Sequence, residues 1–166
     1  MKIAPSQYSE FYRQVTAHIG PIRAPTLIGF DGKGAAGKSS AATWLAWQLG
    51  IPSLHLDLYL ARPVDQGPID WRVDDLNRCV DSRGDHRCLI IEGVLLLDAL
   101  TKIQSRKLGY LVFVENEPPP SPHVRSPQSR VVDPREFALE NQVERYFERA
   151  NPKALADFVL SWREPA

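Results

Sequence analysis

The sequence predicts an α/β domain in which two layers of helices enclose a parallel sheet of five strands, a three-layer α/β/α arrangement. Three observations predict this class. Short apolar runs alternate with helix-forming segments. The runs are continuously apolar, as expected for strands buried on both faces of a parallel sheet. A glycine-rich loop joins the first run to the helix after it. The length of 166 residues suits one domain, residues 1–166, with a proper core.

The glycine-rich loop, residues 32–39, fits the phosphate-binding pattern G-x-x-x-x-G-K-[ST]. Glycines let the backbone curl so that its N–H groups point at phosphate oxygens. Lys38 brings a positive charge to the β- and γ-phosphates, and the Ser39 hydroxyl can ligate Mg²⁺. The candidate nucleotide-binding residues are the loop and the residue after it: Gly32, Lys33, Gly34, Ala35, Ala36, Gly37, Lys38, Ser39 and Ser40.

The setting of the loop favours a P-loop NTPase fold over a dinucleotide-binding fold. A predicted strand over 26–30 precedes the loop, and a predicted helix over 39–49 follows it. The loop also fits the fingerprint G-x-G-x-x-G, and Asp57 lies about 20 residues after it, where a ribose-binding acid is expected. However, Lys38 and Ser39 have no role in a dinucleotide site and two roles at a triphosphate. The chain is also short for a dinucleotide domain plus a substrate domain.

Composition adds few constraints. Lys plus Arg equals Asp plus Glu at 20 each, so the charge gives no indication of nucleic acid or membrane binding. Cys79 and Cys88 lack metal-type spacing and are expected to be buried free thiols in a reducing compartment. No apolar run has membrane-spanning length, and residues 1–20 do not read as a signal peptide. We therefore expect a cytoplasmic protein.

Two acids are expected beside the loop. A second strand over 53–57 ends in Asp57, and a third over 87–93 contains Glu92 near its end. Ligands of parallel sheets lie at the carboxyl ends of the strands. Asp57 is therefore a candidate general base for a substrate hydroxyl, or a partner of Mg²⁺ through water. A solvated carboxylate is the alternative. Glu92 resembles a Walker B acid directed at Mg²⁺. His55 is as well explained by packing or hydrogen bonding as by catalysis.

The remaining elements follow from periodicity. Helices are expected over 6–19, about 73–82, 95–105 and 136–149, and a fourth strand over 110–115. Residues 156–160 fit a fifth strand or a short helix. The 136–149 helix carries a stripe of acids that we expect to be a solvated face: Glu136, Glu140, Glu144 and Glu148.

Two irregular segments are candidates for the substrate side. Asp70, Trp71 and Arg72 combine an acceptor, a flat apolar face and several donors, which suits a polar small molecule. A Trp held in the core beside two surface charges is the alternative. Residues 116–135 are rich in proline and contain Arg125 and Arg130, as in a kinase lid that closes over phosphates. A disordered linker is the alternative.

A GTPase is not favoured. The sequence D-x-x-G at 81–84 precedes the third strand instead of ending one, and no N-K-x-D element is present.

With these motifs in place, the chain resembles the uridine kinase family of P-loop small-molecule kinases. Phe30-Asp31-Gly32 resembles that family's entry into the loop, and residues 156–159 resemble its last strand. The family's D-x-Y is carried by Asp57 and Tyr59, which implies Asp57 as catalytic base and Tyr59 on the substrate side. Its E-G is carried by Glu92 and Gly93, which implies a magnesium-associated acid.

The resemblance implies a sheet ordered 2-3-1-4-5, and ATP with Mg²⁺ as cofactors. It also implies transfer of the ATP γ-phosphoryl group to a hydroxyl of a small molecule. Asp70 loosely matches an aspartate that contacts the substrate ribose. Two departures stand out: the pyrimidine-reading P-x-Y-D-F segment is missing between Leu76 and Arg87, and the proline-rich stretch replaces an arginine-dense lid. The alternative is a nucleotide-binding protein with little turnover.

Overall fold

The computed structural model describes residues 5–20, 25–64, 67–83, 87–117 and 134–163. Within them, five strands form one sheet in the order β2-β3-β1-β4-β5, and each neighbouring pair is parallel. The strands are β1 Leu27–Asp31, β2 Ser53–His55, β3 Leu89–Glu92, β4 Leu108–Glu117 and β5 Phe158–Arg163. The predicted sheet order and parallel pairing are confirmed.

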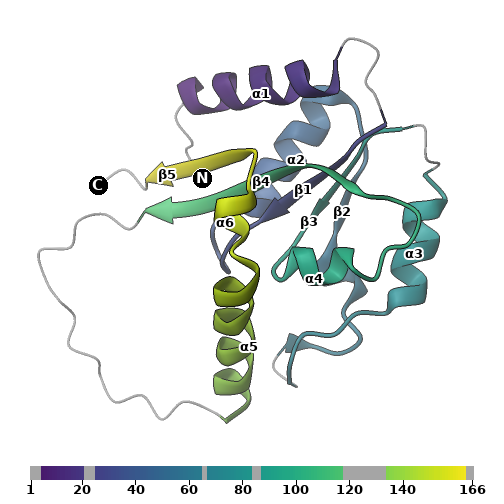
Figure 1. Cartoon of the computed structure of the whole chain (residues 1–166), viewed down its shortest axis with the longest axis vertical. Coiled ribbons are helices and arrows are strands. Elements are labelled where there is room, and N and C mark those ends of the chain that lie inside the picture. Colours follow the sequence, from purple (N-terminus) through teal and green to yellow (C-terminus); the bar gives the residue numbers. More distant parts are fainter. Residues whose placement is uncertain (1–4, 21–24, 65–66, 84–86, 118–133, 164–166) are drawn as a thin grey trace, which may run out of the picture.

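Helices cover both faces of the sheet, which gives the predicted three layers. Helices α1 and α2 lie on one face, and α3, α4 and α5 lie on the other (Figure 1). The helices are α1 Pro5–Ile19, α2 Lys38–Leu49, α3 Val73–Asp81, α4 Leu96–Leu100, α5 Pro134–Ala150 and α6 Pro152–Leu155, and a 3-10 helix, η1, spans Leu56–Tyr59. None of the described helices is long and apolar enough to cross a membrane.

The core consists of two clusters, one on each face of the sheet. Side chains of β1 belong to both clusters, because they point alternately to the two faces of the sheet. Ile28 and Phe30 face α1 and α2, and Leu27 faces the opposite layer. All five residues of β1 are buried, as expected for a central strand of a parallel sheet. The middle of the sheet is therefore rigid, and its carboxyl edge provides a fixed base for the loops that follow.

The second strand is shorter than predicted. It pairs with β3 only from Ser53 to His55, and the chain then turns into η1. Leu56 is 1% exposed and packs under Gly93, where an added Cβ would lie 2.7 Å from the Leu56 Cβ. This packing draws the chain out of the sheet. Asp57 therefore lies in the 3-10 helix and not at the end of the strand, as a correction to the prediction.

Other boundaries also differ from the predictions. β3 begins two residues later than expected, and α4 ends at Leu100 instead of continuing to 105. β4 extends through Glu117, into the start of the proline-rich segment. α5 begins at Pro134, because proline is tolerated in the first turn of a helix. The fifth strand lies at 158–163, two residues late, after the separate short helix α6.

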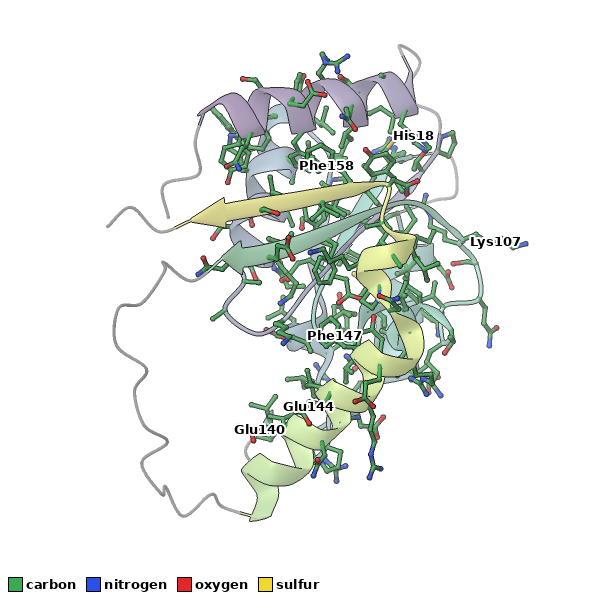
Figure 2. The ribbon with its side chains drawn as sticks, turned by 60° about the vertical axis from the view of Figure 1, so that its left-hand side comes forward. His18, Lys107, Glu140, Glu144, Phe147 and Phe158 are labelled. Carbon is green, nitrogen blue, oxygen red and sulfur yellow. The ribbon has the colours of Figure 1, made fainter. Side chains whose placement is uncertain are left out.

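Helix α5 packs one face on the sheet and exposes the other. Phe147 meets Phe113 of β4 edge to face, with ring centroids 6.2 Å apart (Figure 2). Glu140, Glu144 and Glu148 are exposed, so the described part of the acidic stripe is a solvated face, as predicted. Neither Cys79 nor Cys88 forms a disulfide; Cys88 is buried as expected, whereas Cys79 is only half-buried.

Candidate functional site

The glycine-rich loop joins β1 to α2 at the carboxyl edge of the sheet. Its backbone enters the left-handed region at Ala35 (φ 58°) and at Gly37 (φ 89°), directly before the first turn of α2. Alternation of right- and left-handed residues turns successive N–H groups toward one point and forms an anion-binding concavity. Ala35 adopts this conformation without being a glycine, and backbone strain of this kind is concentrated at functional sites.

Lys38 is the first residue of α2 and is 6% exposed. Its Nζ donates a hydrogen bond to the backbone oxygen of Lys33, 2.8 Å away, across the mouth of the loop. Burial lowers the pKa of Lys38, while the nearby charges of Glu92, Asp31 and Asp57 raise it. The ammonium group thus bonds a backbone oxygen of the loop and lies in the field of three acids, at the place where phosphates would meet the loop.

Glu92 ends β3 and is 2% exposed. Its Oε1 accepts a hydrogen bond from the Ser39 hydroxyl at 3.0 Å and lies 2.6 Å from Nδ1 of His55. His55 thus makes the hydrogen bond that was one of the explanations that the sequence left open. The structure brings the two residues predicted to hold Mg²⁺ into contact, and the histidine orients the carboxylate.

One pocket of about 430 Å³ contains these groups. Its lining comes from the loop, the start of α2, η1 and the end of β3: Gly34, Ala35, Gly37, Lys38, Ser39, Ser40, Asp57, Glu92, Gly93 and Val94. Asp57 reaches it from η1, and its side chain is exposed. The pocket combines groups that donate hydrogen bonds to phosphate, two oxygen ligands for a metal ion and an exposed carboxylate. Such a set can hold a magnesium-bound polyphosphate and face a second substrate.

The oxygen donors suit Mg²⁺, which keeps several waters and is commonly held by one or two protein ligands plus phosphates. Ser39 and Glu92 supply such ligands on two elements that the hydrogen bond already joins. Within the described part of the chain, no group of three or more His, Cys, Asp or Glu side chains could hold a metal ion. A magnesium ion held here by Ser39 and Glu92 would take the rest of its shell from waters and nucleotide phosphates.

A buried acid under the loop was not among the candidate site residues of the sequence. Asp31 is 0% exposed, and its Oδ1 accepts a hydrogen bond from the Gly32 backbone N–H at 2.7 Å. Its Oδ2 accepts a short hydrogen bond from the Tyr146 hydroxyl. Burial raises the pKa of Asp31 to about 6, although the bonds from Tyr146 and Gly32 and the charge of Lys38 act in the opposite direction.

Asp31→Asn is expected to change how stability depends on pH. The pKa of Asp31 is raised from 3.8 to about 6 on folding, so the carboxyl takes up a proton in the native state between these values. Its contribution to stability is full below about pH 4 and is lost as pH rises through about 6. The free energy of unfolding of the variant, relative to the wild type, should therefore rise by on the order of 3 kcal/mol from pH 4 to pH 8. Urea unfolding at both pH values measures this; an equal difference at both would contradict it.

The predicted substrate-side residues do not line this pocket. Trp71 is 9% exposed in the core cluster under α3, which is the alternative that the sequence left open. Tyr59 is directed at Cys79 of α3, and burial together with this contact raises its pKa to about 12. Arg72 binds the backbone oxygen of Leu58 and the carboxylate of Asp75.

Asp70 is exposed, and its carboxylate accepts the backbone N–H of Trp71 at 2.9 Å. The segment around it is fixed by α5, because the Gln142 amide bonds both the N–H and the C=O of Ile69. Arg125 and Arg130, and with them most of the predicted lid, lie outside the described residues.

Sequence reasoning missed the Asp31–Tyr146 pair as part of the site, along with Val94 in the pocket lining. The one local signal was an acid at the end of an otherwise apolar strand, directly before the loop. A buried carboxylate requires partners, so this signal could have prompted a search for a buried donor.

Comparison with known proteins supports the fold. No family model and no curated protein matches the sequence. Among solved structures, a Bacillus stearothermophilus protein provisionally named a uridine kinase is similar, with a TM-score of 0.59 and 15% identity. That alignment covers 93% of this chain and 97% of the other. A protein of a Silicibacter species provisionally named a fructose transport system kinase has a TM-score of 0.50 at 14% identity. This second alignment covers 92% of this chain and 98% of the Silicibacter chain.

The sheet order, the glycine-rich loop and these likenesses define the class of fold: this is an α/β/α P-loop kinase fold. More particularly, the fold is similar to that of the protein provisionally named a uridine kinase, the family that the sequence motifs resemble.

Proposed function

We propose that the protein transfers the γ-phosphoryl group of ATP to a hydroxyl group of a small molecule, with Mg²⁺ as cofactor. The observation that carries this proposal is the pocket in which Lys38, Ser39, Glu92 and Asp57 meet. Three of these four groups serve a metal-bound triphosphate. In this proposal the fourth, Asp57, acts on a second substrate as the base for its hydroxyl.

In this proposal each group has a separate task. The loop amides and Lys38 hold the β- and γ-phosphates and offset charge that develops in the transition state. Ser39 and Glu92 hold the metal ion, and His55 keeps the Glu92 carboxylate directed at it. The magnesium ion, when bound, neutralises phosphate charge. Asp57 orients the acceptor hydroxyl and accepts its proton. Such catalysis depends mainly on positioning and charge stabilisation.

The short connection between α3 and β3 does not identify the chemical class of the phosphoryl acceptor. α3 ends at Asp81 and β3 begins at Leu89, and the P-x-Y-D-F segment that reads the pyrimidine in uridine kinases has no counterpart in this interval. The same feature supports the alternative function, nucleotide binding with little turnover. The two similar structures carry the names of a nucleoside kinase and of a fructose transport system kinase. Nucleosides and sugars are therefore the first acceptors to test.

A coupled assay of ADP formation tests the proposal over nucleosides, sugars and small alcohols, each with ATP and Mg²⁺. We expect at least one acceptor to raise ADP formation well above the rate without acceptor. If ATP binds and no acceptor raises the rate, the binding-protein alternative is supported instead. We further propose that the chain acts in the cytoplasm, where ATP is available and where cysteines outside disulfides, such as Cys79 and Cys88, stay reduced.

A further inference from the structure

The entrance of the phosphate loop is fixed by contacts outside the loop itself. Gly32 has a φ of 147°, and an added Cβ would lie 2.2 Å from the Val114 backbone oxygen of β4. This residue is thus held tightly against the neighbouring strand. On its other side, its N–H is bound by the carboxylate of Asp31. The direction in which the chain leaves β1 therefore depends on β4 and on Asp31.

Asp31 is in turn held by helix α5. Tyr146 is 1% exposed and lies 115 residues away in the sequence. Its hydroxyl donates to Asp31 and accepts a hydrogen bond from the Leu97 N–H at 3.1 Å. The phenol thus joins three elements: α5, the start of α4 and the loop entrance. A phenylalanine would fill the same space, so the hydroxyl is needed for these bonds and not for packing.

The Asp31–Tyr146 pair also affects which groups of the site are charged. Asp31 is one of the three acids whose charge favours the protonated form of Lys38, against the effect of burial. The charged groups that act on Asp31 come from two elements: Lys38 of α2 lowers its pKa, and Asp98 of α4 raises it. The Tyr146 hydroxyl also lowers this pKa by its hydrogen bond. The hydroxyl therefore favours the ionised acid beside Lys38.

We propose that Tyr146 is a positioning residue for the phosphate loop: through the buried carboxylate of Asp31 it sets the orientation of the Gly32 amide and thereby the affinity of the loop for a polyphosphate. The inference rests on the proposed function only as far as nucleotide binding, and no phosphoryl transfer is needed for it. It gives α5 a role in nucleotide binding although Tyr146 does not line the pocket.

Tyr146→Phe tests the proposal, with Tyr110→Phe as a matched control. Tyr110 is also buried, at 5% exposed, but it belongs to the cluster on the opposite face of the sheet. Three quantities are measured: the Gly32 amide resonance and the Asp31 carboxyl titration by NMR without nucleotide, and the affinity for a non-hydrolysable ATP analogue by calorimetry. In Tyr146→Phe we expect a shifted Gly32 resonance, a raised Asp31 midpoint and roughly tenfold weaker binding. Tyr110→Phe should change none of these.

Unchanged Gly32 and Asp31 signals in Tyr146→Phe would overturn the inference, as would changed signals with unchanged affinity, since the pair would then only stabilise the fold. Should Tyr146→Phe not fold, Asp31→Ala replaces it, because it removes the acceptor of both the Gly32 N–H and the Tyr146 hydroxyl. Weaker analogue binding by Asp31→Ala together with a shifted Gly32 resonance supports the inference, and unchanged binding overturns it. A wild-type protein that binds no ATP analogue would instead overturn the proposed function, and the NMR signals would still decide the positioning.

Discussion

Lys38→Ala is expected to abolish tight ATP binding and to leave the fold intact. The Lys38 ammonium lies at the mouth of the loop, where it donates to one backbone oxygen and is affected by the charges of three acids. Loss of one partner of a buried charge pair typically costs about 2–5 kcal/mol, which corresponds to roughly 30- to several-thousand-fold in affinity. Alanine suits the first turn of α2, because it is the best helix former. Calorimetry with an ATP analogue measures the change.

The control for this prediction is Lys107→Ala. Lys107 is exposed, just before the start of β4, at the opposite edge of the sheet from the loop (Figure 2). Lys107→Ala removes one positive charge, as Lys38→Ala does, so a general electrostatic effect would appear in both variants. We expect weakened binding only in Lys38→Ala. Unchanged affinity in Lys38→Ala, with the circular dichroism spectrum of the wild type, would contradict the assignment of the phosphate loop.

The fold and the loop were predictable because their signals are local. A phosphate loop needs glycines and a Lys-Ser pair within eight positions, between a buried strand and a helix, and each of these features can be read from adjacent residues. The apolar runs at the centre of the sheet are similarly clear, since both faces are buried. These two signals were sufficient to predict that Glu92 lies beside the loop, because it directly follows the apolar residues of the third strand.

The position of Asp57 was predicted less well, because it depends on a distant contact. Nothing within residues 53–59 marks the end of the strand at His55. The turn forms because Leu56 packs under Gly93, at the end of another strand. Asp57 still lines the pocket, yet it does so from a 3-10 helix and with an exposed carboxylate. Trp71 shows the same limit: its burial under α3 is a tertiary property that the loop-like sequence around it conceals.

The contact between Asp31 and Tyr146 was beyond the reach of sequence reasoning. The two residues are separated by 115 positions, and Tyr146 appears in the sequence only as one member of an apolar helix face. A hydrogen bond to its hydroxyl leaves no periodic pattern. The same holds for the Gln142 amide, which binds the backbone of Ile69 across 73 positions. Polar contacts between distant elements thus account for much of what the structure adds to the site.

Asp57→Asn is expected to reduce phosphoryl transfer by at least a hundredfold and to leave ATP affinity nearly unchanged. Asparagine keeps the shape of the side chain but has no negative charge and cannot accept the acceptor's proton. A positioned general base typically contributes about 10²–10⁴-fold in rate. Nucleotide binding should persist, because a carboxylate donates no hydrogen bond to phosphate and Asp57 is an exposed residue of the pocket. The rate is measured with the acceptor identified in the coupled assay, and the affinity by calorimetry.

Asp74→Asn serves as the control for Asp57→Asn, since Asp74 is an exposed acid in the first turn of α3, outside the pocket. It removes the same charge, so a rate loss shared by both variants would point to long-range electrostatics. A shift in Mg²⁺ dependence that accompanies the rate loss in Asp57→Asn would assign Asp57 to the metal ion instead of the acceptor hydroxyl. If Asp57→Asn retains near-normal turnover, Asp57 is not the base, and the proton of the acceptor leaves by another route.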